Sequence, residues 1–405
     1  MQFLTAGILI TVIFALAVVY PPALACLSIL TAQPETPMIN VLFTEMSRIP
    51  VVVIQALTFF AACSVFWRIK SAARTNPIYK RKLTITAVAF GISIWIGLSV
   101  FAVTGSAQAG LSQLLSSGIY GIAFVMYYHR NPAAMILIMI SVLIHLMIGI
   151  GIALFPNSTM GLFKPFHTSL LDENYGISSD GIIRENGQFI NSVPFAFYAA
   201  VAIVTGIFTL FYSRTLLLKT LGLIVVVIGS WVSYMTIQRA IWFGIAIAAF
   251  AILKPICKKQ IGRLAYAAYF ASLIFAIYLL YAYTDNPALN NLRSFFLSAG
   301  QDEYRAAAAV NSFDVIFRTP LFGMGGDVQQ LLHETGGLPH QSPYSAAVLY
   351  GVPAGIGVLF LTWICLPFRF LKKKVRKFST EQSHSEIILA TAIAWIVIAM
   401  ALSNN

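Results

Sequence analysis

The sequence predicts an all-α polytopic membrane protein that crosses the bilayer about eleven times. Three observations predict this class: 59% of the residues are hydrophobic, only 10% are charged, and the mean hydropathy is +0.81. A chain of 405 residues with this composition is solvated mainly by lipid, which excludes a set of soluble domains. We therefore treat residues 1–405 as a single integral membrane domain.

The predicted helices follow from apolar segments that approach or exceed the roughly 20 residues needed to cross a bilayer. In chain order the segments cover residues 3–30, 50–67, 83–104, 110–127, 132–155, 194–212, 216–236, 240–253, 264–282, 344–366 and 386–402. Helices are expected because a spanning helix satisfies all of its own backbone hydrogen bonds. The abrupt end at residues 403–405 leaves open a further, twelfth helix.

The links between these segments alternate in charge, and this alternation predicts how the chain is oriented. Lys and Arg concentrate in residues 68–82, 129–130, 214–219, 254–263 and 369–377. Because cytoplasmic links carry an excess of Lys and Arg, this pattern puts the N-terminus in the cytoplasm. It places 19 of the 26 basic residues inside and 12 of the 14 acidic residues outside. It also accounts for the net charge of +12 without a nucleic-acid partner.

Two loops on the predicted outer side are much longer than the other links. The first covers residues 156–193, and the main loop covers residues 284–343. Loops that are longer than a connection requires usually carry function. Only one ionisable side chain, His145, falls deep inside an apolar segment, and for it we expect an interhelical hydrogen bond. We therefore expect a function on the outer face and not along a path through the membrane.

Seven basic side chains remain on the outer side. They are Arg48, Lys164, Arg184, Arg239, Arg293, Arg305 and Arg318. Positive charge on this side opposes the topology rule, so each side chain needs an acidic partner or an anionic ligand. Arg239 separates two apolar segments with almost no loop between them, which places its guanidinium near the membrane surface. It is therefore a strong candidate for binding a ligand.

Residues 305–318 are rich in Ala and have apolar residues at helical spacing, which predicts a helix on the outer surface. This helix begins with Arg305, which has two possible partners, an anionic ligand or the neighbouring Asp302 and Glu303. Both interpretations stay open. Solvation or local pairing is the simpler explanation for Arg318 at the other end of the helix.

Two polar segments follow, a glycine-rich one at residues 319–327 and a second at residues 340–351. The glycines permit close approach of the backbone. His340 lies just before an apolar segment, at the depth of the lipid headgroups, where a neutral imidazole can accept a proton from a sugar hydroxyl. A lone histidine at a helix entrance more often caps the helix or donates a hydrogen bond.

Three blocks of these outer segments, taken in order, resemble the O-antigen ligase and O-antigen polymerase superfamily of bacterial envelope glycosyltransferases. The blocks are residues 184–194, residues 238–242 and residues 305–340. The ligase-type pattern has a His, then Asn, Ser or Gln, and then a Gly, which His340, Gln341 and Gly351 match. The chain departs from the pattern at Ala354, where Gly, Thr or Tyr is usual.

The resemblance implies a GT-C-like, all-helical enzyme in the bacterial inner membrane, with its active site facing the periplasm. Such an enzyme takes a glycan from undecaprenyl pyrophosphate and joins it to a sugar hydroxyl. The resemblance further implies that Arg239 and Arg305 bind the pyrophosphate and that His340 is the general base for the acceptor hydroxyl. The substrate-binding residues that we expect beside them are Arg184, Gln341 and Tyr344.

Three activities fit this interpretation. A ligase has lipid A core as its acceptor, a polymerase has a second lipid-linked repeat unit, and a transporter would move a lipid-linked sugar. The pair His340–Gln341 and the dominant main loop favour the ligase, whereas the first loop with Arg184 favours the polymerase. No metal or other cofactor is expected, because the acidic residues lack metal-ligand spacing and the arginines supply positive charge.

Overall fold

The computed structural model describes residues 49–128, 131–155, 192–236, 239–260, 303–335 and 342–361, with a few isolated positions before residue 24. In these ranges every regular element is a helix and no strand occurs. Six helical segments in these ranges are long and apolar enough to cross a membrane: Val52–Ala73, Lys82–Thr104, Ala107–Tyr128, Ala133–Leu154, Phe195–Tyr212 and Leu216–Thr236. The third of these segments is made of two helices and a short 3-10 turn. The described part is thus an all-α protein with the helices of a multi-pass membrane protein, as its composition predicts.

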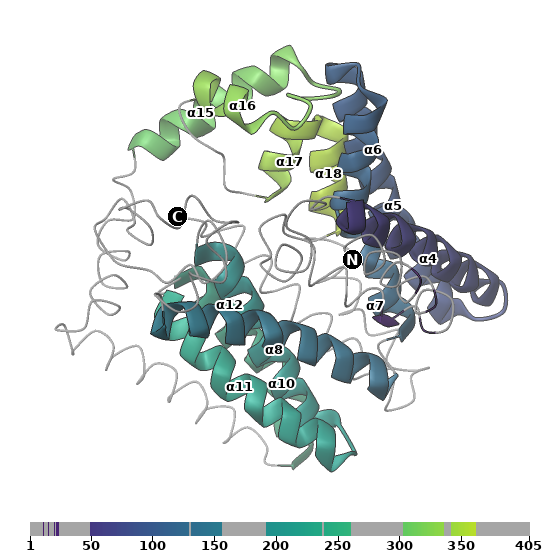
Figure 1. Ribbon diagram of the computed structural model, residues 1–405, viewed down its shortest axis with the longest axis vertical. Coiled ribbons are helices and arrows are strands. Elements are labelled where there is room, and N and C mark those ends of the chain that lie inside the picture. Colours follow the sequence, from purple (N-terminus) through teal and green to yellow (C-terminus); the bar gives the residue numbers. More distant parts are fainter. Residues whose placement is uncertain are drawn as a thin grey trace, which may run out of the picture.

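A first helical group is built by the early part of the chain. It contains α4 (Ile49–Ala73), α5 (Pro77–Thr104), α6 (Ala107–Ser116), α7 (Ile122–Tyr128) and, from much later in the sequence, α18 (Val352–Leu359). Figure 1 shows α18 beside α5. Tyr120 lies in the core of this group at 1% exposure, and its hydroxyl donates to the carbonyl of Leu115 over 2.8 Å. Apolar packing around this aromatic residue holds the group together.

The predicted span at residues 110–127 is interrupted in the structure. Helix α6 ends at Ser116, Gly118 adopts a left-handed conformation with φ of 64°, and a short 3-10 turn, Ile119–Gly121, leads into α7. Apolar composition predicts that a segment is buried or faces lipid, but it does not reveal a change of direction at a single glycine. This explains why the sequence indicated one uninterrupted helix here.

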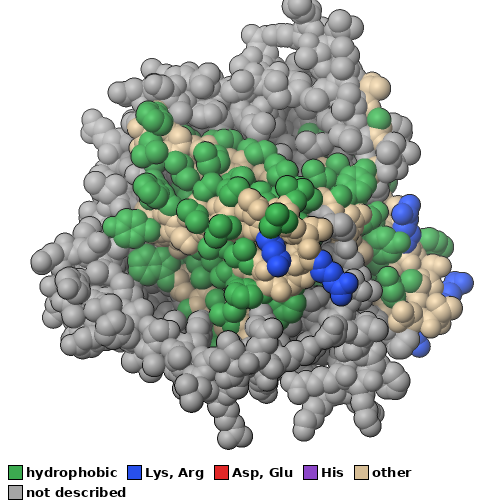
Figure 2. All heavy atoms as spheres, turned by 90° about the horizontal axis from the view of Figure 1, so that it is seen from below, with side chains coloured by type: hydrophobic (Ala, Val, Ile, Leu, Met, Phe, Trp, Pro, Cys, Tyr) green, Lys and Arg blue, Asp and Glu red, His purple; other side chains and the backbone are tan. Residues whose placement is uncertain are grey.

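A second helical group contains α8 (Pro132–Leu154), α10 (Ser192–Tyr212), α11 (Leu216–Thr236) and α12 (Arg239–Gln260). It has its own apolar core, and its helices contact one another in the lower part of Figure 1. Figure 2 shows the molecule from below the view of Figure 1. The described surface on this side is largely hydrophobic, with Lys and Arg side chains among the green patches, and no described Asp or Glu is in view. This distribution is typical of a membrane protein whose lipid-facing sides end in basic links.

A third assembly lies at the top of Figure 1, beside the upper end of the first group. It contains α15 (Glu303–Arg318), α16 (Val328–Thr335) and α17 (Ser342–Tyr350). A small apolar cluster of buried side chains joins them: Val315, Met324, Leu331 and Val348. The helix predicted over residues 305–318 is confirmed as α15.

The other predicted spans have three outcomes. Residues 50–67, 83–104, 132–155, 194–212 and 216–236 fall in long apolar helices, and residues 240–253 fall in α12. Almost all of segment 3–30, together with segments 264–282 and 386–402, lies outside the described residues. The segment 344–366 is not one continuous helix, because α17 ends at Tyr350 and α18 begins at Val352. The total of eleven helices and the GT-C-like arrangement stay predictions.

Candidate functional site

A compact backbone structure, which we call the glycine clasp, joins residues 319–327 to residues 348–352. The amide of Val352 donates to the carbonyl of Pro320 over 2.8 Å. The amides of Met324 and Gly326 donate to the carbonyls of Val348 and Leu349, each over 3.0 Å. The bonds to Val348 and Leu349 satisfy carbonyls that the end of α17 would otherwise leave without partners.

Two glycines make the clasp possible. Gly351 has φ of 90°, in the region that favours glycine, and a Cβ placed there would collide with the carbonyl of Leu321. Gly323 has φ of 59°, and a Cβ there would meet the carbonyl of Val348. The close backbone approach that the glycine-rich sequence predicts is therefore confirmed, and its partner is the break between α17 and α18.

Polar side chains of the first helical group hold the clasp in place. The carbonyl of Tyr350 accepts hydrogen bonds from the Trp95 indole over 3.0 Å and from the Ser99 hydroxyl over 2.9 Å. The amide of Gln113 donates to the Tyr350 hydroxyl over 2.8 Å. The Trp95 ring also stacks on Phe322, with ring centroids 5.6 Å apart. Both sides of the clasp are thus attached to the α5–α6 hairpin.

Sequence reasoning did not select Trp95, Ser99 or Gln113. Their signal is that polar groups stand inside apolar segments, where a helix in lipid needs a partner for each of them. The signal indicates that a partner exists, but not which residue it is. The partner, Tyr350, is more than two hundred residues away in sequence.

Tyr344 connects α17 to α15. Its ring packs against Phe313 with centroids 5.1 Å apart, and its hydroxyl shares a hydrogen bond with the buried Ser312. Tyr344 was predicted to contact substrate, and the structure shows that its ring is half-buried against a neighbouring helix. The contact brings together the helix that contains Arg305 and the helix that directly follows His340 and Gln341.

The structure describes the other predicted site residues only in part. Arg305 lies in the first turn of α15, and Arg239 is the first residue of α12. Arg184, His340 and Gln341 lie outside the described residues. Helices α15 and α17 belong to one assembly, whereas α12 belongs to the second helical group. The roles of these residues stay predictions.

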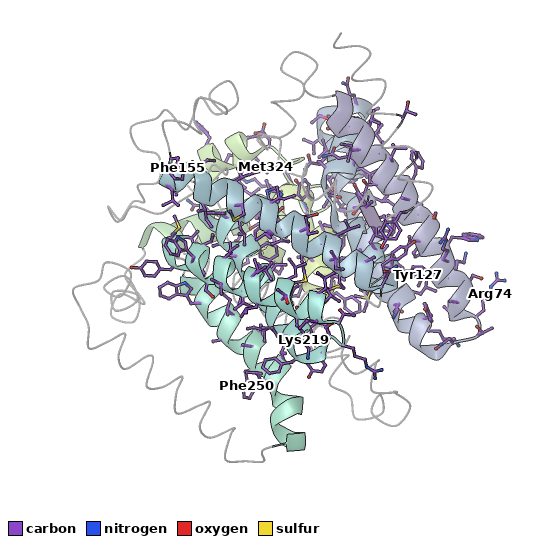
Figure 3. The ribbon with its side chains drawn as sticks, turned by 60° about the horizontal axis from the view of Figure 1, so that its bottom comes forward. Arg74, Tyr127, Phe155, Lys219, Phe250 and Met324 are labelled. Carbon is purple, nitrogen blue, oxygen red and sulfur yellow. The ribbon has the colours of Figure 1, made fainter. Side chains whose placement is uncertain are left out.

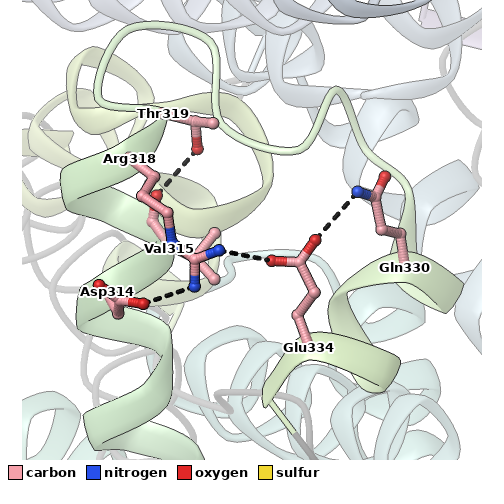
Figure 4. A network of polar contacts seen from close by, with 6 residues as sticks. All are labelled: Asp314, Val315, Arg318, Thr319, Gln330 and Glu334. Atoms are coloured by element: carbon pink, nitrogen blue, oxygen red, sulfur yellow. Dashed lines mark hydrogen bonds and ion pairs between the residues drawn. The ribbon is translucent and has the colours of Figure 1, made fainter.

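Arg318, at the far end of α15 from Arg305, is part of a network of charged and polar side chains (Figure 4). Its guanidinium pairs with Asp314 and lies 3.7 Å from a carboxylate oxygen of Glu334. Glu334 also accepts a hydrogen bond from the Gln330 side chain over 3.0 Å. The simpler interpretation of Arg318, a locally paired surface charge, is therefore confirmed.

His145 is fully buried in the second helical group. Its ring lies 4.5 Å from the ring of Tyr198, centroid to centroid, so the contact joins α8 to α10. This ring contact is interhelical, and the hydrogen bond that we expected for His145 stays a prediction. Packing in the protein core accounts for this intramembrane histidine.

Among the described residues, no group of three or more His, Cys, Asp or Glu side chains is placed to hold a metal ion. What the described arrangement offers is a helical assembly with a small apolar core, made of α15, the clasp and α17. No family model matches the chain, and no curated protein matches its sequence.

Proposed function

We propose that this chain is an O-antigen ligase-type glycosyltransferase of the bacterial inner membrane. It moves a glycan from undecaprenyl pyrophosphate to a sugar hydroxyl of lipid A core at the periplasmic face. The observation that carries the proposal is the contact of Tyr344 with Ser312 and Phe313. This contact supports one site, because it joins the helix that contains Arg305 to the helix that follows His340.

The chemistry requires two kinds of group at the membrane surface. The leaving pyrophosphate is anionic, and the planar guanidinium of an arginine binds phosphate oxygens through two parallel hydrogen bonds. Arg305 and Arg239 have this role in the proposal and stabilise the charge that builds on the leaving group. His340 accepts the proton of the acceptor hydroxyl, and Arg184 and Gln341 contact the glycan.

The clasp supports this proposal because it fixes the position of α17. His340 and Gln341 directly precede α17, and the other end of α17 is fixed by the hydrogen bonds of Trp95, Ser99 and Gln113. A catalytic base works best when a rigid element defines its position. In the proposal, α17 is that element.

A transporter for a lipid-linked sugar is disfavoured by the surroundings of His145. Transporters place ionisable side chains along a path through the membrane. The ring of His145 is fully buried against Tyr198 in the apolar core of the second group. This burial supports a one-sided enzyme.

A repeat-unit polymerase of the same superfamily is the second candidate. It would use the same donor and join the glycan to a second lipid-linked repeat unit. The feature that favours it is the first outer loop, residues 156–193, which contains Arg184.

The test is the lipopolysaccharide pattern on a gel from a deletion strain complemented with wild type, His340→Ala, Arg239→Ala or Arg305→Ala. We expect all three variants to lose the long-chain ladder, because each removes a group that acts on the reacting atoms. The matched control is Arg318→Ala on the same helix as Arg305, which is expected to keep the ladder because Arg318 pairs with Asp314 and Glu334. Membrane levels of every variant are compared by immunoblot.

The deletion strain itself separates the candidates. Long glycan left on the polyprenyl carrier together with bare core on lipid A identifies a ligase, whereas core bearing a single repeat unit identifies a polymerase. If His340→Ala, Arg239→Ala and Arg305→Ala all restore the wild-type ladder at normal protein levels, the assigned site is wrong.

A further inference from the structure

The α4–α5 hairpin has an exposed stripe that changes along α4 from apolar to aromatic to basic. Phe60 is 67% exposed and Trp67 is 66% exposed. Lys70 follows at helical spacing on the same face, Arg74 stands in the turn directly after α4, and both are exposed. The opposite face of α4 packs into the first group, with three fully buried residues: Ala62, Val65 and Ile69.

The stripe has the length and order of a lipid in one leaflet. Phe60 and Lys70 are separated by about 15 Å along the helix axis, at 1.5 Å per residue. This is half of the roughly 30 Å hydrocarbon core. With Lys70 at the level of the headgroups, Phe60 therefore lies near the middle of the bilayer. Trp67 then lies at the interface, which tryptophan favours.

The side chains of Lys70 and Trp67 contact each other on this stripe. The Lys70 ammonium lies 4.8 Å from the centroid of the Trp67 ring, within the range of a cation–π contact. This contact holds the ammonium over the exposed aromatic side chain instead of leaving it extended into water. A positive charge is thus fixed where the apolar part of the stripe ends.

The positive charge of the α4–α5 hairpin is not balanced by acidic residues nearby in the sequence. Among the described side chains of the hairpin, four basic ones are exposed: Arg68, Lys70, Arg74 and Lys80. The sequence has no Asp or Glu between Glu45 and Asp172. The preference of cytoplasmic links for Lys and Arg explains the number of cations. It does not explain why Lys70 and Arg74 continue the exposed stripe of Phe60 and Trp67.

We infer that the α4–α5 hairpin binds an anionic phospholipid, with its phosphate at Lys70 and Arg74 and an acyl chain along Trp67 and Phe60. Basic residues at the end of a membrane helix attract anionic headgroups. A membrane lipid is the occupant because the exposed stripe below the cations is apolar, and a soluble phosphate would make no contact with it. The inference does not depend on the proposed glycosyltransferase activity or on which leaflet the hairpin faces.

The test uses quenching of tryptophan fluorescence by brominated lipids. The full chain is reconstituted into phosphatidylcholine vesicles that contain either brominated phosphatidylglycerol or brominated phosphatidylcholine. A parallel sample of Trp67→Phe gives the fluorescence quenching of the other tryptophans. The difference between the wild type and this variant is the quenching of Trp67, which measures the lipid bound there. We expect the anionic lipid to be preferred there by at least about fivefold, because each basic residue near the surface contributes about 1 kcal/mol and the site has two.

Two double variants with the same loss of charge test the site. In the double variant Lys70→Gln with Arg74→Gln, the ratio of Trp67 quenching by the anionic lipid to that by phosphatidylcholine is expected to fall close to one. Arg214→Gln with Lys219→Gln, on the α10–α11 hairpin, is expected to leave it at the wild-type value. Figure 3 shows Arg74 and Lys219 at separate places on the molecule. All four side chains are exposed, so both proteins are expected to keep the wild-type unfolding temperature.

Three results would overturn the inference. Equal quenching by the two brominated lipids in the wild type means that no anionic lipid is selected. An equal loss of preference in the two double variants means that overall surface charge is responsible. Relief of quenching by soluble glycerol phosphate means that the hairpin binds free phosphate, whereas no relief supports a lipid.

Discussion

The α10–α11 pair and the glycine clasp both depend on glycine, but for different physical reasons. In the pair, a Cβ on Gly206 would lie 2.6 Å from the carbonyl of Gly222, and one on Gly229 would lie 3.0 Å from the carbonyl of Ala199. All these residues are in ordinary helical conformation. In the clasp, Gly351 is both close to Leu321 and in a positive-φ conformation that favours glycine, with φ of 90°.

The difference reflects what each region must achieve. Helices in lipid gain no hydrophobic driving force from pairing, so small residues let their surfaces make close van der Waals contact. The clasp changes the direction of the chain and must still satisfy its backbone groups, which the bonds to Pro320, Val348 and Leu349 accomplish. Two helices can separate slightly to admit a methyl group, whereas the clasp cannot move without losing its hydrogen bonds.

The largest effect is expected from Gly351→Ala. The substitution forces a non-glycine residue into a positive-φ conformation, at about 1–3 kcal/mol, and adds a collision with a backbone oxygen. We expect loss of more than about 3 kcal/mol of unfolding free energy, or failure to accumulate in the membrane. Thermal unfolding of the detergent-solubilised protein measures the effect.

Gly91→Ala is the matched control for that substitution. Gly91 lies on α5, and a Cβ there would meet nothing within 4 Å. Because alanine favours a helix over glycine by up to about 1 kcal/mol, this variant is expected to be as stable as the wild type or slightly more stable. If Gly351→Ala and Gly91→Ala unfolded at the same temperature, the rigid clasp would be refuted.

A smaller loss is expected from Gly206→Ala. The new methyl group must move α10 and α11 apart, which typically costs about 1–3 kcal/mol, and the better helix propensity of alanine offsets up to about 1 kcal/mol of it. The net destabilisation should therefore be below that of Gly351→Ala. Unfolding of the two variants in the same detergent makes the comparison. A larger effect at Gly206 would reverse the order of rigidity assigned to the two regions.

The α10–α11 pair is easier to predict from the sequence than the glycine clasp. The α10–α11 pair can be anticipated because long apolar segments around a basic link specify two helices, and their small residues mark a contact face. The clasp is anticipated only as a glycine-rich segment. Its partner is a break at Gly351 within a segment that reads as one apolar helix, and nothing local links that break to Trp95 or Gln113. The candidate site shows the same limit, because residue type suggests chemistry at Arg305 but does not specify that Tyr344 contacts α15.

The smallest effect is expected at the side-chain bond between Gln113 and Tyr350, which anchors the clasp from α6. Removing one partner of a half-buried hydrogen bond costs about 1 kcal/mol, so Gln113→Ala should destabilise the protein by roughly that amount. Tyr350→Phe removes the same bond from the other side and keeps the ring. In the double variant the two losses should not add, because both substitutions delete one interaction.

This double-mutant cycle also separates the anchor from the backbone of the clasp. The carbonyl of Tyr350 keeps its bonds from Trp95 and Ser99 in all three variants, so the turn at Gly351 should persist. Unfolding midpoints of the three variants give the coupling energy. Fully additive losses would mean that Gln113 and Tyr350 act independently, and α6 would then have no part in fixing α17. A coupling near 1 kcal/mol would show that the α5–α6 hairpin fixes the clasp through side chains as well as through backbone carbonyls.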